Sequence, residues 1–88
     1  MLKKQLYRPF VSKSKNKKYA VYVLDKKDNP KLIHFGDKRF NHFRDELGHY
    51  KYLDTNDKER RRLYFARHGT TKDINTARFW ANRILWNG

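Results

Sequence analysis

A histidine near an aspartate is the first place to look for catalysis in this chain. His34 stands shortly before Gly36 and Asp37, and a histidine beside a carboxylate is the arrangement of a general base with an orienting partner. No nucleophile is recognisable next to them. We therefore favour a structural interpretation, in which Gly36 takes a special backbone angle and Asp37 caps a following helix.

The histidines do not have the spacing of a metal site. They are His34, His42, His49 and His68, and no cysteine or closely spaced histidine pair accompanies them. We expect no metal ion, no other cofactor and no enzymatic activity. His68 precedes Gly69 at a predicted helix end, where the helix dipole favours a charged imidazole.

Arginine supplies a stronger chemical signal. A predicted helix carries Arg60, Arg61, Arg62 and Arg67. A guanidinium group binds phosphate through two hydrogen bonds, and the neighbouring Tyr64 or Phe65 could stack on a base. Alternatively, nearby acids such as Asp57 and Glu59 pair with these arginines at the surface. We expect a mixture, with Arg61 or Arg67 structural and the others exposed.

The net charge narrows the class of partner. The 88 residues carry 22 Lys and Arg against 9 Asp and Glu, a formal net charge of +13. This excess favours nucleic acid, an anionic membrane surface or an acidic protein. The absence of cysteine excludes disulfides and thiolate metal sites. No membrane-span or signal-peptide pattern is present, so we expect an intracellular protein.

Residues 1–18 are predicted to form a basic N-terminal arm, because they contain no acid. The cations of this arm are Lys3, Lys4, Arg8, Lys13, Lys15, Lys17 and Lys18. Such an arm can neutralise phosphates and release the counterions around nucleic acid. A flexible terminus that only keeps the protein soluble remains the alternative.

A β-hairpin is predicted after the arm. Residues 19–24 are aromatic and β-branched, residues 26–30 have turn composition, and residues 31–35 form the returning strand. Next, Phe40, Phe43 and Leu47 fall at helical spacing and predict a short helix over residues 38–47.

Two more helices are predicted in residues 54–86. The first begins near Asn56 and ends at Gly69, and either Asp73 or Asn75 caps the second. The second has an apolar stripe of Ala77, Trp80, Ala81, Ile84 and Leu85. Trp80 should therefore be buried, whereas Arg78 lies off the stripe and joins the predicted nucleic-acid contacts.

These elements predict an α+β fold. Residues 19–88 should form a single compact domain, in which an antiparallel hairpin of two strands, with room for a third, packs on two or three short helices.

Three blocks in the same order carry a resemblance to a known family. They are HFGD at residues 34–37, RRRLYFARHG at residues 60–69 and TARFW at residues 76–80. The chain resembles an uncharacterised family of small basic proteins from large DNA viruses of algae and protists, and short proteins of tailed marine phages. This resemblance implies a viral origin and a location in the virion or inside the infected cell. It assigns no catalytic residue.

We expect sequence-nonspecific nucleic-acid binding, to DNA rather than RNA, through the N-terminal arm and the arginine helix. The alternative is a minor capsid or cement protein that contacts viral structural proteins. A third and weaker hypothesis is a nuclease that resembles the GIY-YIG class. The chain departs from that class because Tyr19-Ala20-Val21-Tyr22 and His34-Phe35-Gly36 stand in place of its motifs, and Glu59 is only a candidate metal ligand. We expect neither a membrane span nor a small-molecule substrate.

Overall fold

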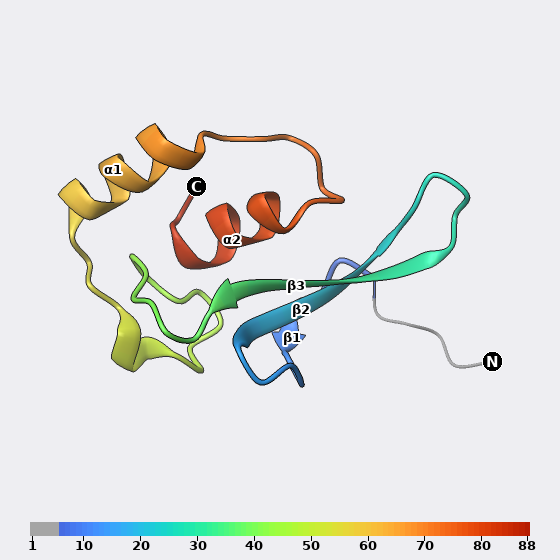
Figure 1. The fold of residues 1–88 in the computed structure, drawn as a ribbon, viewed down its shortest axis with the longest axis horizontal. Coiled ribbons are helices and arrows are strands. Elements are labelled where there is room, and N and C mark those ends of the chain that lie inside the picture. The colour runs from blue at the N-terminus through green and yellow to red at the C-terminus, as the bar shows by residue number, and fades with distance from the viewer. Residues whose placement is uncertain (1–5) are drawn as a thin grey trace.

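Three antiparallel strands lie at the base of the fold, with two helices on one side of them (Figure 1). The computed structural model describes residues 6–88. The central strand β2 (Lys17–Leu24) pairs with the short β1 (Phe10–Val11) and with β3 (Pro30–Asp37). This α+β arrangement confirms the predicted fold class and supplies the third strand for which the hairpin left room.

Alternation along β2 and β3 builds the core. Tyr19 pairs with Phe35 and Val21 pairs with Ile33, and all four side chains are buried. Because alternate residues of a strand share one face, these pairs form one apolar surface. Asp25 closes the hairpin by accepting hydrogen bonds from two backbone N–H groups of the turn.

Helix α2 (Ala77–Leu85) covers that surface. Its stripe delivers Trp80, Ile84 and Leu85 to the core, as predicted. The helix begins at Thr76, whose Oγ1 accepts a hydrogen bond from the N–H of Phe79 at 3.3 Å. The prediction of Asp73 or Asn75 as the cap was therefore wrong.

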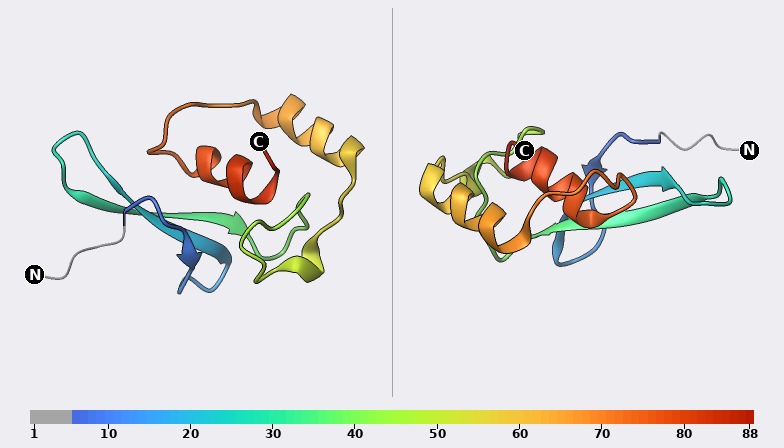
Figure 2. Two further views of the ribbon diagram at one scale, coloured as in Figure 1. Left: turned by 180° about the vertical axis from the view of Figure 1, so that it is seen from behind. Right: turned by 90° about the horizontal axis from the view of Figure 1, so that it is seen from above.

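Helix α1 (Lys58–His68) lies on the outer side of α2 (Figures 1 and 2). Asp57 caps it, rather than Asn56, and Gly69 ends it with a φ of 71° as expected. None of its residues is fully buried. The Tyr64 ring stacks on Trp86 at 4.0 Å, so an aromatic contact joins α1 to the segment that follows α2.

The predicted helix over residues 38–47 is wrong, because backbone N–H groups in this segment bond elsewhere. Those of Phe43 and Arg44 donate to the carbonyl oxygen of Leu85 at the end of α2. The buried Asp45 carboxylate binds further backbone N–H groups. Asp37, expected to cap this helix, instead accepts from the N–H of Arg39 in a turn. A single 3-10 turn, η1 (Lys51–Leu53), follows.

Part of the predicted arm belongs to the sheet. Phe10 and Val11 form β1, and Lys17 and Lys18 begin β2. Lys3 and Lys4 lie outside the described residues. In residues 6–88, no helix has both the length and the apolar character needed to cross a bilayer.

Candidate nucleic-acid interface

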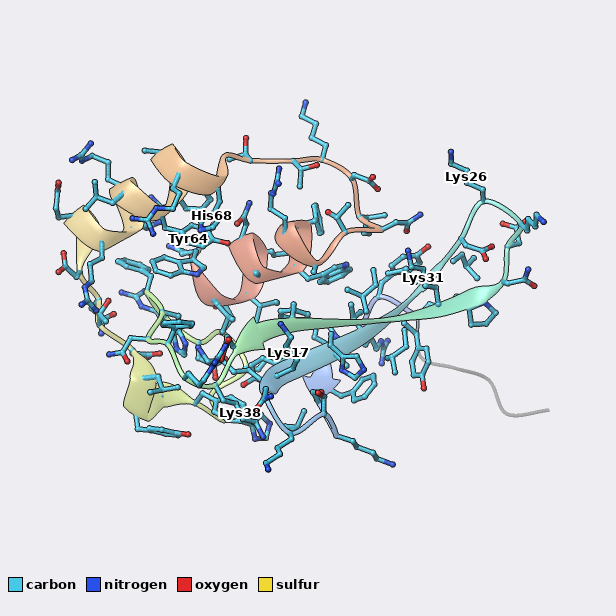
Figure 3. All side chains as sticks on the ribbon, viewed as in Figure 1. Lys17, Lys26, Lys31, Lys38, Tyr64 and His68 are labelled. Atoms are coloured by element: carbon cyan, nitrogen blue, oxygen red, sulfur yellow. The ribbon has the colours of Figure 1, made fainter. Side chains whose placement is uncertain are left out.

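A groove of about 840 Å³ runs between α1, the segment after β3 and the end of α2. Helix α1 contributes Arg60, Arg67 and His68 to it, and the segment after β3 contributes Arg39. Figure 3 shows Tyr64 and His68 on the side of α1 that faces α2. Arg39 is distant from helix α1 in the sequence, and the fold brings it to the same depression as Arg60 and Arg67.

Helical spacing places Arg60 and Arg67 together. Residues seven apart lie nearly in line along an α-helix, since two turns take about seven residues. Both side chains are exposed, and within residues 6–88 neither has a hydrogen-bonded or ionic partner. These two guanidinium groups are therefore available to an anion.

Arg39 has a carboxylate partner in the groove wall. Its guanidinium donates to Asp37 at 2.8 Å, and these hydrogen bonds lower the pKa of Asp37 to about 2. Among the described residues that line the groove, Asp37 is the one carboxylate. Arg39, Arg60 and Arg67 outnumber this one carboxylate, so the groove wall carries a net positive charge at neutral pH.

Two of the predicted contact residues serve the fold or a local pair instead. Arg61 donates to the carbonyl oxygens of Trp86 and Asn87, each at 2.8 Å, and packs over the Phe65 ring. This confirms the expectation that Arg61 or Arg67 is structural. Arg62 pairs with Glu59 one helical turn away. That exposed pair leaves Arg62 partly neutralised.

Lys18 is a correction to the predicted arm. Its side chain is only 2% exposed, and its Nζ donates to the carbonyl oxygen of Phe40 at 2.8 Å and to Nδ1 of His42 at 2.9 Å. Burial lowers the pKa of Lys18 to about 8, although Asp45 opposes this shift. A lysine so enclosed cannot reach out to phosphates, and instead lies at the groove floor and supports its wall.

A buried polar chain continues from Lys18. The ammonium group can only donate, so Nδ1 of His42 accepts, and Nε2 carries the proton that is donated to Asp54 at 2.6 Å. Burial, aided by the charge of Lys18, lowers the pKa of His42, and the hydrogen bond to Asp54 only partly opposes this. The imidazole is consequently neutral at pH 7.

Acid should weaken the fold through His42. Because its pKa is below the ordinary 6.5 in the folded state, the unfolded chain takes up this proton first. The stability contributed by neutral His42 is fully present well above pH 6.5, where the unfolded imidazole is also neutral, and is lost as pH falls through that value. We expect the free energy of unfolding, measured with urea, to decline between about pH 7 and pH 5. In His42→Gln, which retains a donor and an acceptor, this decline should be smaller; an equal decline would exclude His42 as its cause.

The other predicted contact residues do not join the groove. Lys13 and Lys15 are exposed between β1 and β2, Arg8 lies near the N-terminal end of the described chain, and Arg78 is exposed on α2. Lys17 lies with Lys38 at one end of the sheet, whereas Lys26 and Lys31 mark the opposite, hairpin end (Figure 3).

Sequence reasoning missed Arg39 and Phe40 as site residues. Both were assigned to a helix that does not exist, which hid their position at the end of β3. The Gly36-Asp37 pair was the available signal, since Gly36, with a φ of 76°, and Asp37 end β3 and line the groove just before Arg39 and Phe40.

Comparisons of the chain with family models, curated proteins and solved structures give no match. The viral origin therefore remains a prediction from the sequence. Within residues 6–88, no group of three or more histidine, aspartate or glutamate side chains is arranged to hold a metal ion.

Proposed function

We propose that this protein binds nucleic acid without sequence specificity, with the α1 groove as its main contact surface. The observation that carries the proposal is the pair of guanidinium groups, Arg60 and Arg67, which have no partner within residues 6–88 and lie on a wall where Asp37 is the one carboxylate among those residues. Guanidinium groups bind phosphate oxygens through paired hydrogen bonds. The exposed Lys13 and Lys15 would extend the contact to neighbouring phosphates.

Lack of sequence specificity follows from the kind of side chains present. Reading a base edge requires hydrogen-bonding groups held in a fixed register, typically on an element that enters a groove of the duplex. The groove instead offers arginines that suit phosphates and rings that suit any base. DNA in a virion or an infected cell is the target that we propose, in line with the expected viral origin.

Fluorescence anisotropy at several salt concentrations tests this function. The logarithm of the binding constant for duplex DNA falls with the logarithm of salt concentration by about 0.9 for each phosphate neutralised. We expect Arg60→Ala with Arg67→Ala to weaken binding and to flatten this slope by up to about 1.8, because two contacts are lost.

Lys26→Ala with Lys31→Ala is the matched control. It removes the same charge from the hairpin end of the sheet, far from the labelled Tyr64 and His68 (Figure 3). Its slope should remain close to that of the wild type. Equal slopes for all three proteins would show that the groove does not carry the binding.

An apolar depression supports a second function, contact with a structural protein. Tyr7, Leu47, Ile74 and Phe79 line this hollow of about 550 Å³, beside the cations Arg8 and Arg83. Tyr7, Leu47 and Ile74 are each more than a third exposed. Apolar surface with a charged rim is common at protein interfaces. A minor capsid or cement protein would use this face to bind a capsid protein. The test is binding to a capsid protein that resists high salt in the wild type and is lost in Ile74→Asp.

A further inference from the structure

We infer that the α1 groove recognises unpaired bases, so that the preferred ligand is single-stranded nucleic acid. The inference rests on the proposed function and names the form of nucleic acid that the site accepts. Its basis is an exposed phenylalanine, Phe40, which is held in place at the edge of the groove.

Phe40 is 63% exposed and takes no part in the core. Exposing a large apolar ring to water is unfavourable. The Arg39 guanidinium lies 5.6 Å from the centre of this ring. The exposed ring can stack on a base, and Arg60 and Arg67, which line the same groove, can bind its phosphates.

The backbone of Phe40 is fixed on both sides. Its carbonyl oxygen accepts from the buried ammonium of Lys18 at 2.8 Å, and its N–H donates to the carbonyl oxygen of Asp37 at 3.2 Å. Lys38, two residues before Phe40, is also anchored, since its N–H donates to the carbonyl oxygen of Asn16 at 3.0 Å. A ring on an anchored backbone loses less entropy on binding than one on a free loop.

The groove mixes cations with apolar and aromatic surface. Leu63, which is 48% exposed, and Tyr64 lie on α1 between Arg60 and Arg67 in the sequence, and Trp86 joins them from the end of α2. Tyr64 and Trp86 stack on each other, but a site that contacted only the duplex backbone would leave the exposed Leu63 and Phe40 without a partner, because the faces of paired bases are hidden in the stack. Single strands offer both phosphates and open base faces.

The test compares a short labelled oligothymidylate with a mixed-sequence duplex of the same length, by anisotropy. We expect the wild type to prefer the single strand. Since stacking of one base contributes about 1–3 kcal/mol, Phe40→Ala should weaken single-strand binding about 5- to 150-fold and change duplex binding by less than about twofold. Tyr52→Ala, which removes a 76% exposed ring that does not line the groove, should change neither.

Phe40→Trp adds a direct readout of stacking. The affinity of this variant for oligothymidylate should match that of the wild type. Oligothymidylate should also quench the tryptophan emission of the variant more strongly than that of the wild type, whose tryptophans are Trp80 and Trp86. Equal or tighter duplex binding, with no selective effect of Phe40→Ala, would overturn the inference and leave the proposed function standing. Failure to bind either form would overturn both.

Discussion

Replacing Asp45 with alanine should lower the free energy of unfolding by about 3–5 kcal/mol, because each buried donor left unsatisfied costs about 1–3 kcal/mol. The Asp45 carboxylate, in a residue only 2% exposed, accepts from the Tyr19 hydroxyl at 2.6 Å. It also accepts from the backbone N–H groups of Tyr50 at 2.7 Å and Leu47 at 2.8 Å. Burial alone would raise the pKa of Asp45, but these hydrogen bonds outweigh it and lower the pKa.

Urea denaturation at neutral pH measures this loss, and Asp25→Ala is the control. Asp25 also accepts from two backbone N–H groups, but in the exposed hairpin turn, where water can replace it. We expect the control to lose about 1 kcal/mol or less. Similar losses in the two variants would mean that Asp45 does not organise the segment between β3 and α1.

Gly36→Ala should be the second most damaging change. The φ of Gly36 is 76°, and an added Cβ would lie 2.7 Å from Cδ1 of the buried Leu85 and 3.2 Å from Cβ of Lys18. A residue with a Cβ at this positive φ lowers the free energy of unfolding by about 1–2 kcal/mol. Overpacking adds about 1–3 kcal/mol, because Leu85 is only 2% exposed and has little room to move.

Gly48→Ala is the control, because it carries the cost of the backbone angle without the cost of overpacking. Gly48 has a similar φ of 88°, but an added Cβ there would meet only the Lys51 side chain, at an ordinary 3.5 Å. Thermal unfolding should show a clearly larger loss for Gly36→Ala than for Gly48→Ala. If both variants melted together, the Cβ added at position 36 would fit beside Leu85 and Lys18 without cost, and the overpacking argument would be wrong.

The regular elements were predictable because their signals are local. The aromatic and β-branched residues of 19–24 and 31–35, with turn residues between them, indicate the hairpin, and the apolar stripe of residues 77–85 indicates α2 and the burial of Trp80. Both patterns depend only on neighbours in the chain, so no knowledge of the fold is needed to read them.

The segment after β3 could not be predicted in this way. Phe40 and Phe43 have helical spacing, yet one is 63% exposed and the other is 6% exposed. Their backbone follows hydrogen bonds to distant partners such as Leu85 and the buried Lys18. Such contacts appear only once α2 has packed on the sheet, and they decide where Arg39 and Phe40 lie.

The sequence predicted that helix α1 contributes to the candidate site, but not which side chains line the groove. The charge excess and the arginines of residues 60–67 pointed to a polyanion, and Arg60 and Arg67 do line the groove. Some arginines form hydrogen bonds within the fold, and their partners lie far away in the sequence. Arg61, for example, donates to the carbonyl oxygens of Trp86 and Asn87. A count of charges cannot show this pairing.

The most direct test of groove binding is an NMR titration of the ¹⁵N-labelled protein, with oligothymidylate and with duplex DNA in separate series. We predict that the largest backbone shift changes lie in residues 36–42 and 60–68, with the Arg60 and Arg67 side-chain Nε–H signals shifting as saturation is approached. Residues 25–31 of the hairpin should change little. Changes confined to the hairpin or to the N-terminal lysines, with both ligands, would contradict binding in the groove.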